Sequence, residues 1–421
     1  MLRPRSRILF GDDAPKSVLR LSGTTKSLTG GTLAEGRTSS ATYIDTDGLL
    51  KTAAANVPVW ENGGLRHEGA STNLLLQSEN LGTTWTQYFT TVSLDAIASP
   101  DGATSAEKII ETIDNNLHGI YQNVNPNGAY SISGHFRSSE RRYVGYRIQK
   151  TTNDYATTVF DSLNGVVSQS TVVGVTITNV SSSVKPAVNS FYRCITKFTK
   201  PIAAFNIFVH LHTTGTPTLN TNGGETYVGD ITKGLYMWGF QFESGDATSY
   251  IPTTTAAVTR ATCALSVPLV LNQNFFQKSA IVMRVRAKHA NSATAKSWLT
   301  PSTTAEGLID NGSGALTFKD SAANTATANL TSWAADTIIL VAIVTDNATG
   351  LMSLSASKDN GVTWIDSADT AFAGLTVGAN WLLFSANTQV FECLGWNVIK
   401  SNKGFAQMKT YAKANALRLT Q

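Results

Sequence analysis

A two-residue alternation of apolar and polar side chains is the feature that most constrains how this chain can fold. In residues 205–212 the odd positions are apolar, and the even positions are Asn206, Phe208, His210 and His212. Successive residues of a β-strand point to opposite sides of the sheet, so this period predicts strands. Short alternating runs recur from about 66 to 258 and are separated by turn pairs such as Asn127-Gly128. This pattern predicts an antiparallel β-sandwich or jelly roll.

Residues 259–421 repeat this style and then end in a helix. Alternating runs at 281–286 and 351–357 predict further strands, and Asn360-Gly361 predicts a tight hairpin turn. Over 402–417 apolar side chains fall on one helical stripe, formed by Phe405, Met408, Ala412 and Ala416. We expect this stripe to pack on the sandwich. The order of strands before a final helix resembles a concanavalin- or laminin-G-like jelly roll.

These patterns divide the chain into three predicted parts. Residues 1–65 are expected to form a mostly irregular N-terminal segment, 66–258 a first sandwich, and 259–421 a second one. A chain of 421 residues is long enough for two or three domains. The predicted fold class is therefore all-β, with two antiparallel β-sandwich domains and a short C-terminal helix.

The low charge and the missing motifs argue against several classes of protein. Charged residues make up 15% of the chain and the net charge is +4, so nothing points to a nucleic-acid partner. No apolar stretch is long enough to span a bilayer. No nucleophile elbow, phosphate loop or zinc-protease motif is present, and we expect no enzyme. The three cysteines are far apart and are predicted to be free thiols: Cys194, Cys263 and Cys393.

Two groups of motifs frame the first sandwich. The opening group runs from Gly64-Leu65-Arg66 through Asn73-Leu74-Leu75 to Glu79 and Trp85, and the closing group runs from Met237 to Arg260. Over residues 43–262 the chain resembles a β-sandwich module of tail and head-fibre proteins of tailed bacteriophages. In that family a Trp usually stands where this chain has Phe191. The resemblance implies fold-defining roles, and no catalytic ones, for Trp85, Trp238, Gly239, Gln241, Glu243, Tyr250, Pro252 and Arg260.

The resemblance implies a virion protein, made in the host cytoplasm and carried on the extracellular particle. We expect non-enzymatic recognition of a host-surface glycan, attachment to other virion proteins through residues 1–65, and a homotrimer whose weak sites add by avidity. One alternative is a purely structural decoration, collar or baseplate protein that cements neighbouring subunits. Another is a polysaccharide-cleaving tailspike. An apolar outer face would favour the structural role, and a solvent-facing aromatic groove would favour recognition.

Aromatic rings stack on sugars, and adjacent polar groups bind the hydroxyls, so strand-borne residues of these types are candidate glycan contacts. The candidates are Phe208, His210, His212, Tyr143, Tyr146 and Arg147, with Trp298 and Trp333 in the last domain. The pair His210-x-His212 could alternatively bind a metal on a trimer axis.

Two carboxylates are candidates for a structural calcium ion. Glu79 and Glu243 lie near the two ends of the module, and related carbohydrate-binding jelly rolls often hold one Ca²⁺. Both could instead join strand ends through hydrogen bonds. No cofactor is required by the predicted function. Glu107 and Glu111 lie four residues apart on either a short helix or a strand, and are expected to face solvent.

Overall fold

The computed structural model describes residues 17–22, 25–29, 34–61, 64–124, 127–200, 205–268, 278–287, 290, 295–300, 306–375, 380–383, 391–400 and 404–418. Contacts divide the chain into two compact units. Unit 1 contains residues 1–38, 54–69 and 261–421, and unit 2 contains 39–53 and 70–260. Antiparallel strands build both units, so the all-β prediction is confirmed. Residues 1–65, predicted as one segment, instead divide between the two units.

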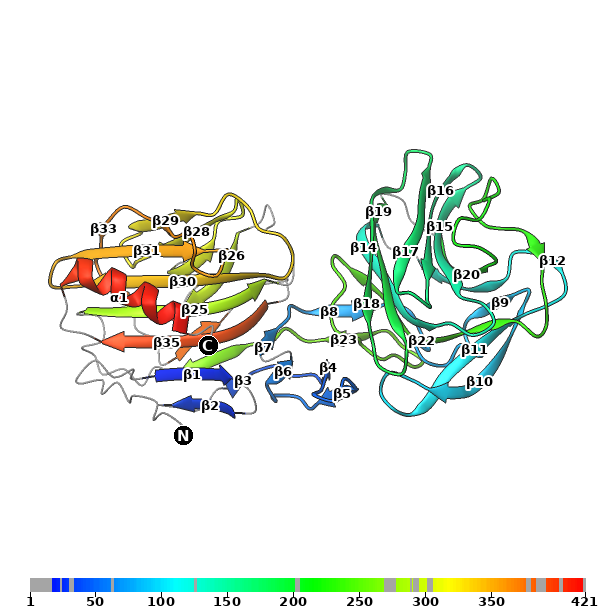
Figure 1. The fold of residues 1–421 in the computed structure, drawn as a ribbon, viewed down its shortest axis with the longest axis horizontal. Helices are drawn as coiled ribbons and strands as arrows, with labels where there is room; N and C mark the ends of the chain where they lie inside the picture. Colours follow the sequence, from blue (N-terminus) through cyan, green and yellow to red (C-terminus); the bar gives the residue numbers. More distant parts are fainter. Residues whose placement is uncertain are drawn as a thin grey trace, which may run out of the picture. The chain divides into compact units, whose positions relative to one another are not determined.

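Unit 2 is a sandwich of two six-stranded sheets (Figure 1). The order in one sheet is β10 (Thr90–Ala98), β11 (Thr104–Glu111), β22 (Gly234–Ser244), β14 (Gly128–Arg137), β19 (Tyr192–Lys200) and β18 (Thr178–Pro186). The order in the other is β17 (Val166–Val173), β16 (Asp154–Asp161), β15 (Tyr143–Thr151), β20 (Phe205–His212), β13 (Gly119–Val124) and β9 (Thr86–Tyr88).

The core of unit 2 lies between these two sheets. Ile207, Val209 and Leu211 of β20 are buried in it, as the alternation of this strand predicts. Phe240 of β22 contributes from the other sheet and packs on the ring of Trp85, with 4.9 Å between the centroids. The period of two therefore assigns the inward face of β20 correctly.

Three short strand pairs complete unit 2. They are β4 (Ala41–Ile44) with β5 (Leu50–Ala53), β8 (Ser71–Asn73) with β23 (Val258–Arg260), and β12 (Asn115–Asn116) with β21 (Tyr227–Val228). The first pair comes from the predicted N-terminal segment. It is tied to unit 2 by backbone and side-chain hydrogen bonds, for example from Leu50 N to Pro100 O at 2.9 Å.

Unit 1 has two larger sheets. One has the order β2 (Thr25–Thr29), β1 (Ser17–Ser22), β35 (Phe391–Lys400), β25 (Lys278–Ala287), β30 (Thr337–Asp346), β31 (Leu351–Ser357) and β32 (Ile365–Asp366), joined by β33 (Thr370–Ala371), β6 (Val59–Glu61) and β7 (Gly64–His67). The other has the order β29 (Thr325–Asn329), β28 (Ala315–Lys319), β27 (Gly307–Asp310), β26 (Lys296–Thr300), β34 (Asn380–Leu383), β24 (Leu265–Pro268) and β3 (Ala34–Glu35).

Helix α1 (Phe405–Arg418) lies across β25 and β30 of unit 1 (Figure 1). Its residues Met408, Ala412 and Ala416 are buried against apolar side chains of these strands, which confirms the predicted helix and its packing role. Lys409 and Lys413 extend to Asp369 and Asp366, each with 2.6 Å between nitrogen and oxygen. Their ammonium groups therefore stay at the surface while the stripe is buried.

The predicted turn at Asn360-Gly361 is also confirmed. Both residues have positive φ, 56° and 84°, at the centre of a turn in which Val362 N donates to Asp359 O at 3.3 Å. This turn lies within residues 358–364, which connect β31 to its antiparallel partner β32. Two consecutive positive φ angles are what a tight hairpin turn of this type requires, and Asn-Gly meets that requirement at low cost.

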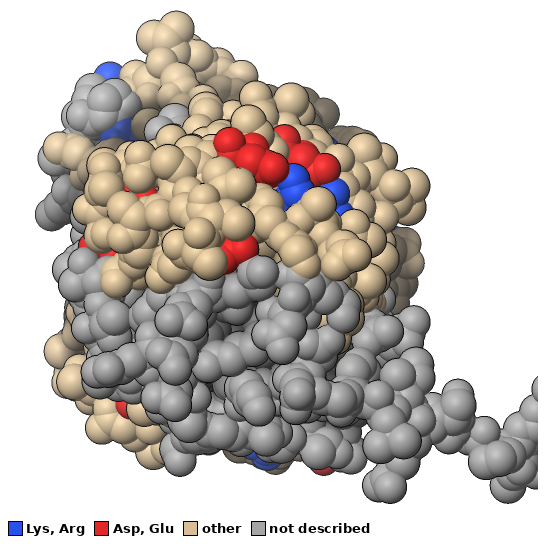
Figure 2. Space-filling model, turned by 90° about the vertical axis from the view of Figure 1, so that its left-hand side faces the viewer, with Lys and Arg blue, Asp and Glu red and all other residues tan. Residues whose placement is uncertain are grey.

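Charged side chains are sparse on the described surface. On the face shown in Figure 2 they gather in a few small groups, and most of the described surface is uncharged. Within the described part of the chain, no helix has the length and apolar character that crossing a bilayer requires.

Candidate binding site

A buried amide joins the opening and closing motifs of unit 2. Asn73 donates from Nδ2 to the carbonyl oxygens of Phe240 (2.9 Å) and Ile251 (2.8 Å). Its Oδ1 accepts from the backbone amides of Leu75 (3.1 Å) and Phe242 (3.0 Å). One side chain thus satisfies four backbone groups on three separate segments, which buried backbone requires.

Gln241 and Glu243 hold the segment that follows β22. Gln241 accepts at Oε1 from Ile251 N (2.6 Å) and donates from Nε2 to Ser249 O (3.1 Å). Glu243 accepts from Thr248 N (2.9 Å), from Thr248 Oγ1 (2.6 Å) and from Ser71 Oγ (2.6 Å). Both side chains therefore serve to shape the backbone, in agreement with the alternative that left Glu243 as a hydrogen-bonding residue.

Aromatic residues of the motifs pack around this network. Trp238 is buried, donates from Nε1 to Ser105 Oγ (3.1 Å), and lies 4.9 Å from the ring of Tyr250. Gly239 has a φ of 63° where β22 bulges against β14. A Cβ there would lie 3.1 Å from His135 Nδ1 and 3.4 Å from the Tyr250 ring, so both conformation and space favour glycine.

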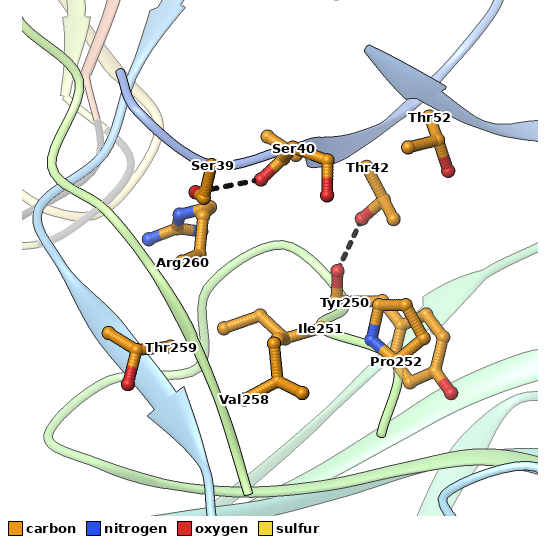
Figure 3. Close-up of a pocket in the computed structure, with 11 residues that line it drawn as sticks. Ser39, Ser40, Thr42, Thr52, Tyr250, Ile251, Pro252, Val258, Thr259 and Arg260 are labelled. Atoms are coloured by element: carbon orange, nitrogen blue, oxygen red, sulfur yellow. Dashed lines mark hydrogen bonds between the residues drawn. The ribbon is translucent and has the colours of Figure 1, made fainter. Parts of the chain in front are cut away.

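A small pocket of about 90 Å³ lies beside the closing motif, within unit 2 (Figure 3). Thr42 of β4 forms part of its wall and donates to Tyr250 O at 2.6 Å, which ties β4 to the closing segment. Arg260 donates from Nη1 to Ser249 Oγ at 2.7 Å. The lining residues are Ser39, Ser40, Ala41, Thr42, Thr52, Tyr250, Ile251, Pro252, Val258, Thr259 and Arg260.

The chemistry of this pocket suits a small polar substituent. Its wall combines Ser and Thr hydroxyls and one guanidinium with the apolar side chains of Ile251 and Val258. Its volume is well below the roughly 300 Å³ at which ligand pockets usually begin. A pocket of this size is too small for a whole sugar ring and leaves room for one small group at most. Sequence reasoning named Tyr250, Pro252 and Arg260 for the fold, but missed the part from β4 and β5.

Two of the predicted glycan contacts, Arg147 and His212, contact a loop on the outer side of their sheet. Residues 213–226 cross the outer side of β20, β15 and β16, and we call them the covering loop. Glu225 contacts His212 Nδ1 at 3.1 Å, and Arg147 Nη1 donates to Asn222 O at 3.2 Å. Gly223 and Gly224 let the loop lie flat, because a Cβ at Gly223 would collide with the Tyr155 ring.

The loop and the core together remove most of these side chains from solvent. Phe208, His210, His212 and Arg147 are buried on the outer side of the sheet, Tyr146 is buried in the core, and only Tyr143 is half-buried. The structure brings Arg147 over the ring of Phe208, 3.9 Å from its centroid. Arg147, Phe208, His210 and His212 form one packed cluster, and an aromatic groove open to an incoming sugar is not among its features. Trp298 and Trp333 are likewise buried, in the core of unit 1.

The cluster has an unusual electrostatic environment. Burial, and then the charge of Arg147, hold the pKa of His210 well below its usual range. Neither ring nitrogen of His210 has a hydrogen-bond partner among the described residues. Burial also lowers the pKa of Arg147 to about 10. His210 is therefore neutral in the folded protein.

The carboxylates proposed for calcium are engaged by protein groups. The hydroxyl of Tyr250 donates to Glu79 Oε1 at 3.0 Å, and burial raises the pKa of Glu79. Glu243 is occupied as described above. Within the described part of the chain, no group of three or more His, Cys, Asp or Glu side chains is placed to hold a metal ion. Calcium binding stays a prediction, and so does metal binding by His210 and His212.

The pair Glu107 and Glu111 lies on a strand, β11, which settles the choice between helix and strand. Both carboxylates are buried, contrary to the expectation that they face solvent. Glu107 accepts from Leu81 N, and burial raises its pKa to about 7. Glu111 accepts from Arg141 Nε at 2.6 Å and from the Tyr227 hydroxyl at 2.6 Å.

The thiols of Cys194 and Cys263 are free and buried, as predicted, and the side chain of Cys393 lies outside the described residues. Burial raises the pKa of the Cys194 thiol well above its usual range, so this thiol is protonated and unreactive.

Comparison with known proteins yields only distant likenesses. No protein-family model matches the chain, and no curated protein matches its sequence. The binding domain of botulinum neurotoxin serotype D aligns with a TM-score of 0.27 and 12% identity, over 36% of this chain and 40% of that one. The tail fibre protein gp63.1 of an E. coli phage aligns with a TM-score of 0.19 and 10% identity, over 78% of this chain and 41% of that one. The chain thus spans about two fifths of each, and scores this low carry no argument about function.

Proposed function

We propose that this chain is a non-enzymatic structural protein of a tailed-bacteriophage particle, a tail or head fibre that binds neighbouring subunits. The opening and closing motifs of unit 2, with their resemblance to the fibre module, support the assignment to a virion. One observation carries the assembly role: within residues 163–175, unit 2 exposes five large apolar side chains, namely Leu163, Val166, Val167, Val172 and Val175. Exposed apolar groups of this kind are typical of interaction surfaces.

The burial of the predicted glycan contacts also favours assembly over recognition. Five of the six side chains are covered, so the open aromatic groove that would support sugar binding is not formed by them. Attachment through residues 1–65 remains part of the proposal, although the described strands of this segment pack within units 1 and 2.

Detection of the protein in purified particles tests this function. Particles produced from the genome that encodes this chain would be purified and probed with an antibody raised against it. We expect labelling at regular positions on the particle in electron micrographs. A chain that is abundant in the lysate but missing from washed particles would contradict the virion assignment.

Recognition of a host-surface glycan is the second candidate, and the hydroxyl-lined pocket beside Tyr250 favours it. Purified protein would be mixed with host cells before phage is added, and unadsorbed phage would be counted. Ser40→Phe fills the pocket, and Ser93→Phe, at an exposed position of β10, is the matched control. Recognition through the pocket predicts dose-dependent protection that only Ser40→Phe abolishes. Release of new reducing ends from the glycan would instead indicate an enzyme.

A further inference from the structure

Residues 163–184 carry no charged side chain and no histidine, and we call this stretch the uncharged edge segment. It contains β17, a short connection, and the first seven residues of β18. At the average of the chain, which is 15% charged residues, a stretch of this length would carry about three. The absence of charge is therefore a local property of this segment.

The uncharged edge segment lies at the border of both sheets of unit 2. Among the described strands β17 pairs only with β16, and β18 pairs only with β19. One side of each strand therefore presents backbone N–H and C=O groups that no neighbouring strand takes up. Such an edge is a template for pairing with another chain.

The valines of this segment extend the core to the surface. Val167 pairs with Phe160 and Val172 with Ala156, and both partners are core residues. Directly paired residues point to the same side of a sheet, so these valines face the interior side. Yet Val172 is 46% exposed. On the facing sheet, Val180 and Val184 of β18 are only partly buried against the same core.

The other sheet edges of unit 2 carry protective features. Strand β10 is broken by two register shifts and contains Asp95 in a left-handed conformation, with a φ of 49°. Strand β9 has three residues. The far end of β18 carries Lys185 and Pro186. Strand β17 has one register shift but neither a charged residue nor a proline, so it is the least protected of these edges.

A second copy of this chain is the partner that such a surface fits. A two-fold axis brings a surface against the same surface of another copy, so a charge close to the axis would lie near its own copy and be repelled. A strip of valine, serine and threonine has no such cost, and its free edge can pair with an identical free edge. A partner of opposite charge would find nothing to complement here.

We infer that the uncharged edge segment of unit 2, residues 163–184, is the surface through which copies of this chain associate. This inference rests on the proposed structural function and names the partner. Association buries Val167 and Val172 and gives β17 a strand neighbour.

Sedimentation of the full-length protein tests the inference. Val167→Lys combined with Val172→Lys places two ammonium groups in the strip, and Val228→Lys, at a 66% exposed position of β21, is the matched control. We expect the wild type and the control to sediment as a multiple of the 44.9 kDa chain. For the double variant, the concentration at half-association should rise at least about tenfold, because an unpaired buried charge is strongly unfavourable.

A wild-type protein that stays a single chain at all concentrations would overturn the inference, as would a folded double variant that associates like the wild type. If the double variant does not fold, hydrogen exchange of the wild type decides. Protection of the β17 amides must then rise with protein concentration, and a protection that does not change would count against the inference. Failure of the proposed function is distinguishable, because it shows as absence from particles whatever the state of association.

Discussion

Single buried ionisable residues determine how the stability of this protein responds to pH. Glu107 is a carboxyl in β11 whose pKa is raised by burial to about 7 in the folded chain, against 4.5 for the free group. Below pH 4.5 it is protonated in the folded and the unfolded chain alike. As the pH rises from 4.5 to 7 the unfolded chain loses the proton first, so stability falls over this window.

Glu107→Gln should remove this loss while keeping an oxygen for the Leu81 amide. We expect the variant to gain about 1–2 kcal/mol over the wild type at pH 8, less than the full electrostatic value because water screens part of the group. Urea unfolding at pH 5 and pH 8 measures the difference. Glu140→Gln, at a surface ion pair with Lys108, is the control and should change stability by about 0.5 kcal/mol or less. Equal stabilities of Glu107→Gln and wild type at pH 8 would contradict a raised pKa of Glu107.

His210 should act in the opposite direction. Burial lowers the pKa of His210 well below 6.5, and the charge of Arg147 and the neighbouring His212 and His118 lower it further. Among the described residues, the only carboxylate against His210 and His212 is Glu225, which contacts His212. The unfolded chain takes up a proton below pH 6.5 and the folded chain does not, so stability present above pH 6.5 is lost as the pH falls. We expect a contribution of up to about 1.4 kcal/mol per pH unit. In His210→Gln the unfolding free energy should change less steeply with pH between pH 5 and 6.5 than in the wild type. An unchanged slope would count against a lowered pKa of His210.

At the scale of elements, the opening and closing strands of unit 2 depend on a single amide. Asn73→Ala leaves four buried backbone groups without their partner: two on β22, one at Leu75 after β8, and one in the closing segment. We expect a loss of about 3 kcal/mol in the free energy of unfolding, since each buried unsatisfied group costs about 1–3 kcal/mol and some relax. Among the described residues the Asn80 side chain accepts only from the nearby Gly82 amide, at 3.1 Å, so Asn80→Ala should lose less than about 1 kcal/mol. Denaturant unfolding of the two variants side by side checks this order.

The sequence could predict elements whose pattern is local, and it failed where a distant segment decides. The alternation of β20 indicated its inward face, Asn360-Gly361 indicated a turn, and the apolar stripe indicated helix α1. The outer face of β20 was taken for a binding surface because nothing in its own residues indicates the covering loop. The composition of Asn222-Gly223-Gly224 is typical of a turn, but that it lies flat on Tyr155 follows only from tertiary contacts. The pocket was missed for the same reason, since it needs β4 beside Tyr250.

On the scale of the whole molecule, the engagement of Glu79 and Glu243 bears on metal dependence. Glu243 already accepts four hydrogen bonds from Ser71, Gln241 and Thr248, so removal of Ca²⁺ should cost nothing there. We expect the thermal midpoint of the full chain to be the same, within about 1 °C, in EDTA and in millimolar Ca²⁺. A midpoint that rises by several degrees with Ca²⁺ would restore calcium as a ligand of this protein.

The division into units shows why the predicted domain limits and the structure differ. Turn clusters and alternation suggested a simple succession of segment, sandwich and sandwich, because period and turn signals describe only neighbours in sequence. The pairing of β1 and β7 with β35 joins residues more than 300 positions apart, and no local signal encodes it. Similarly, β3 pairs with β24, which follows residues 70–260 of unit 2 in the sequence.

Because the two units are interleaved along the sequence, they cannot be completed in the same order in the nascent chain. Strand β7 leaves the ribosome long before its partner β35, with residues 68–390 still to be translated between them. At elongation rates of about 5–20 residues per second this interval lasts roughly 15 to 65 s. All of residues 70–260 emerge meanwhile and can fold. In unit 1, β1 can pair with β2 and β7 with β6, but the edges of β1 and β7 that pair with β35 stay open until β35 is made. A chain released before residue 391 is made would therefore contain a complete unit 2 attached to an incomplete unit 1. The unpaired strand edges of unit 1 would then be exposed to chaperones and proteases.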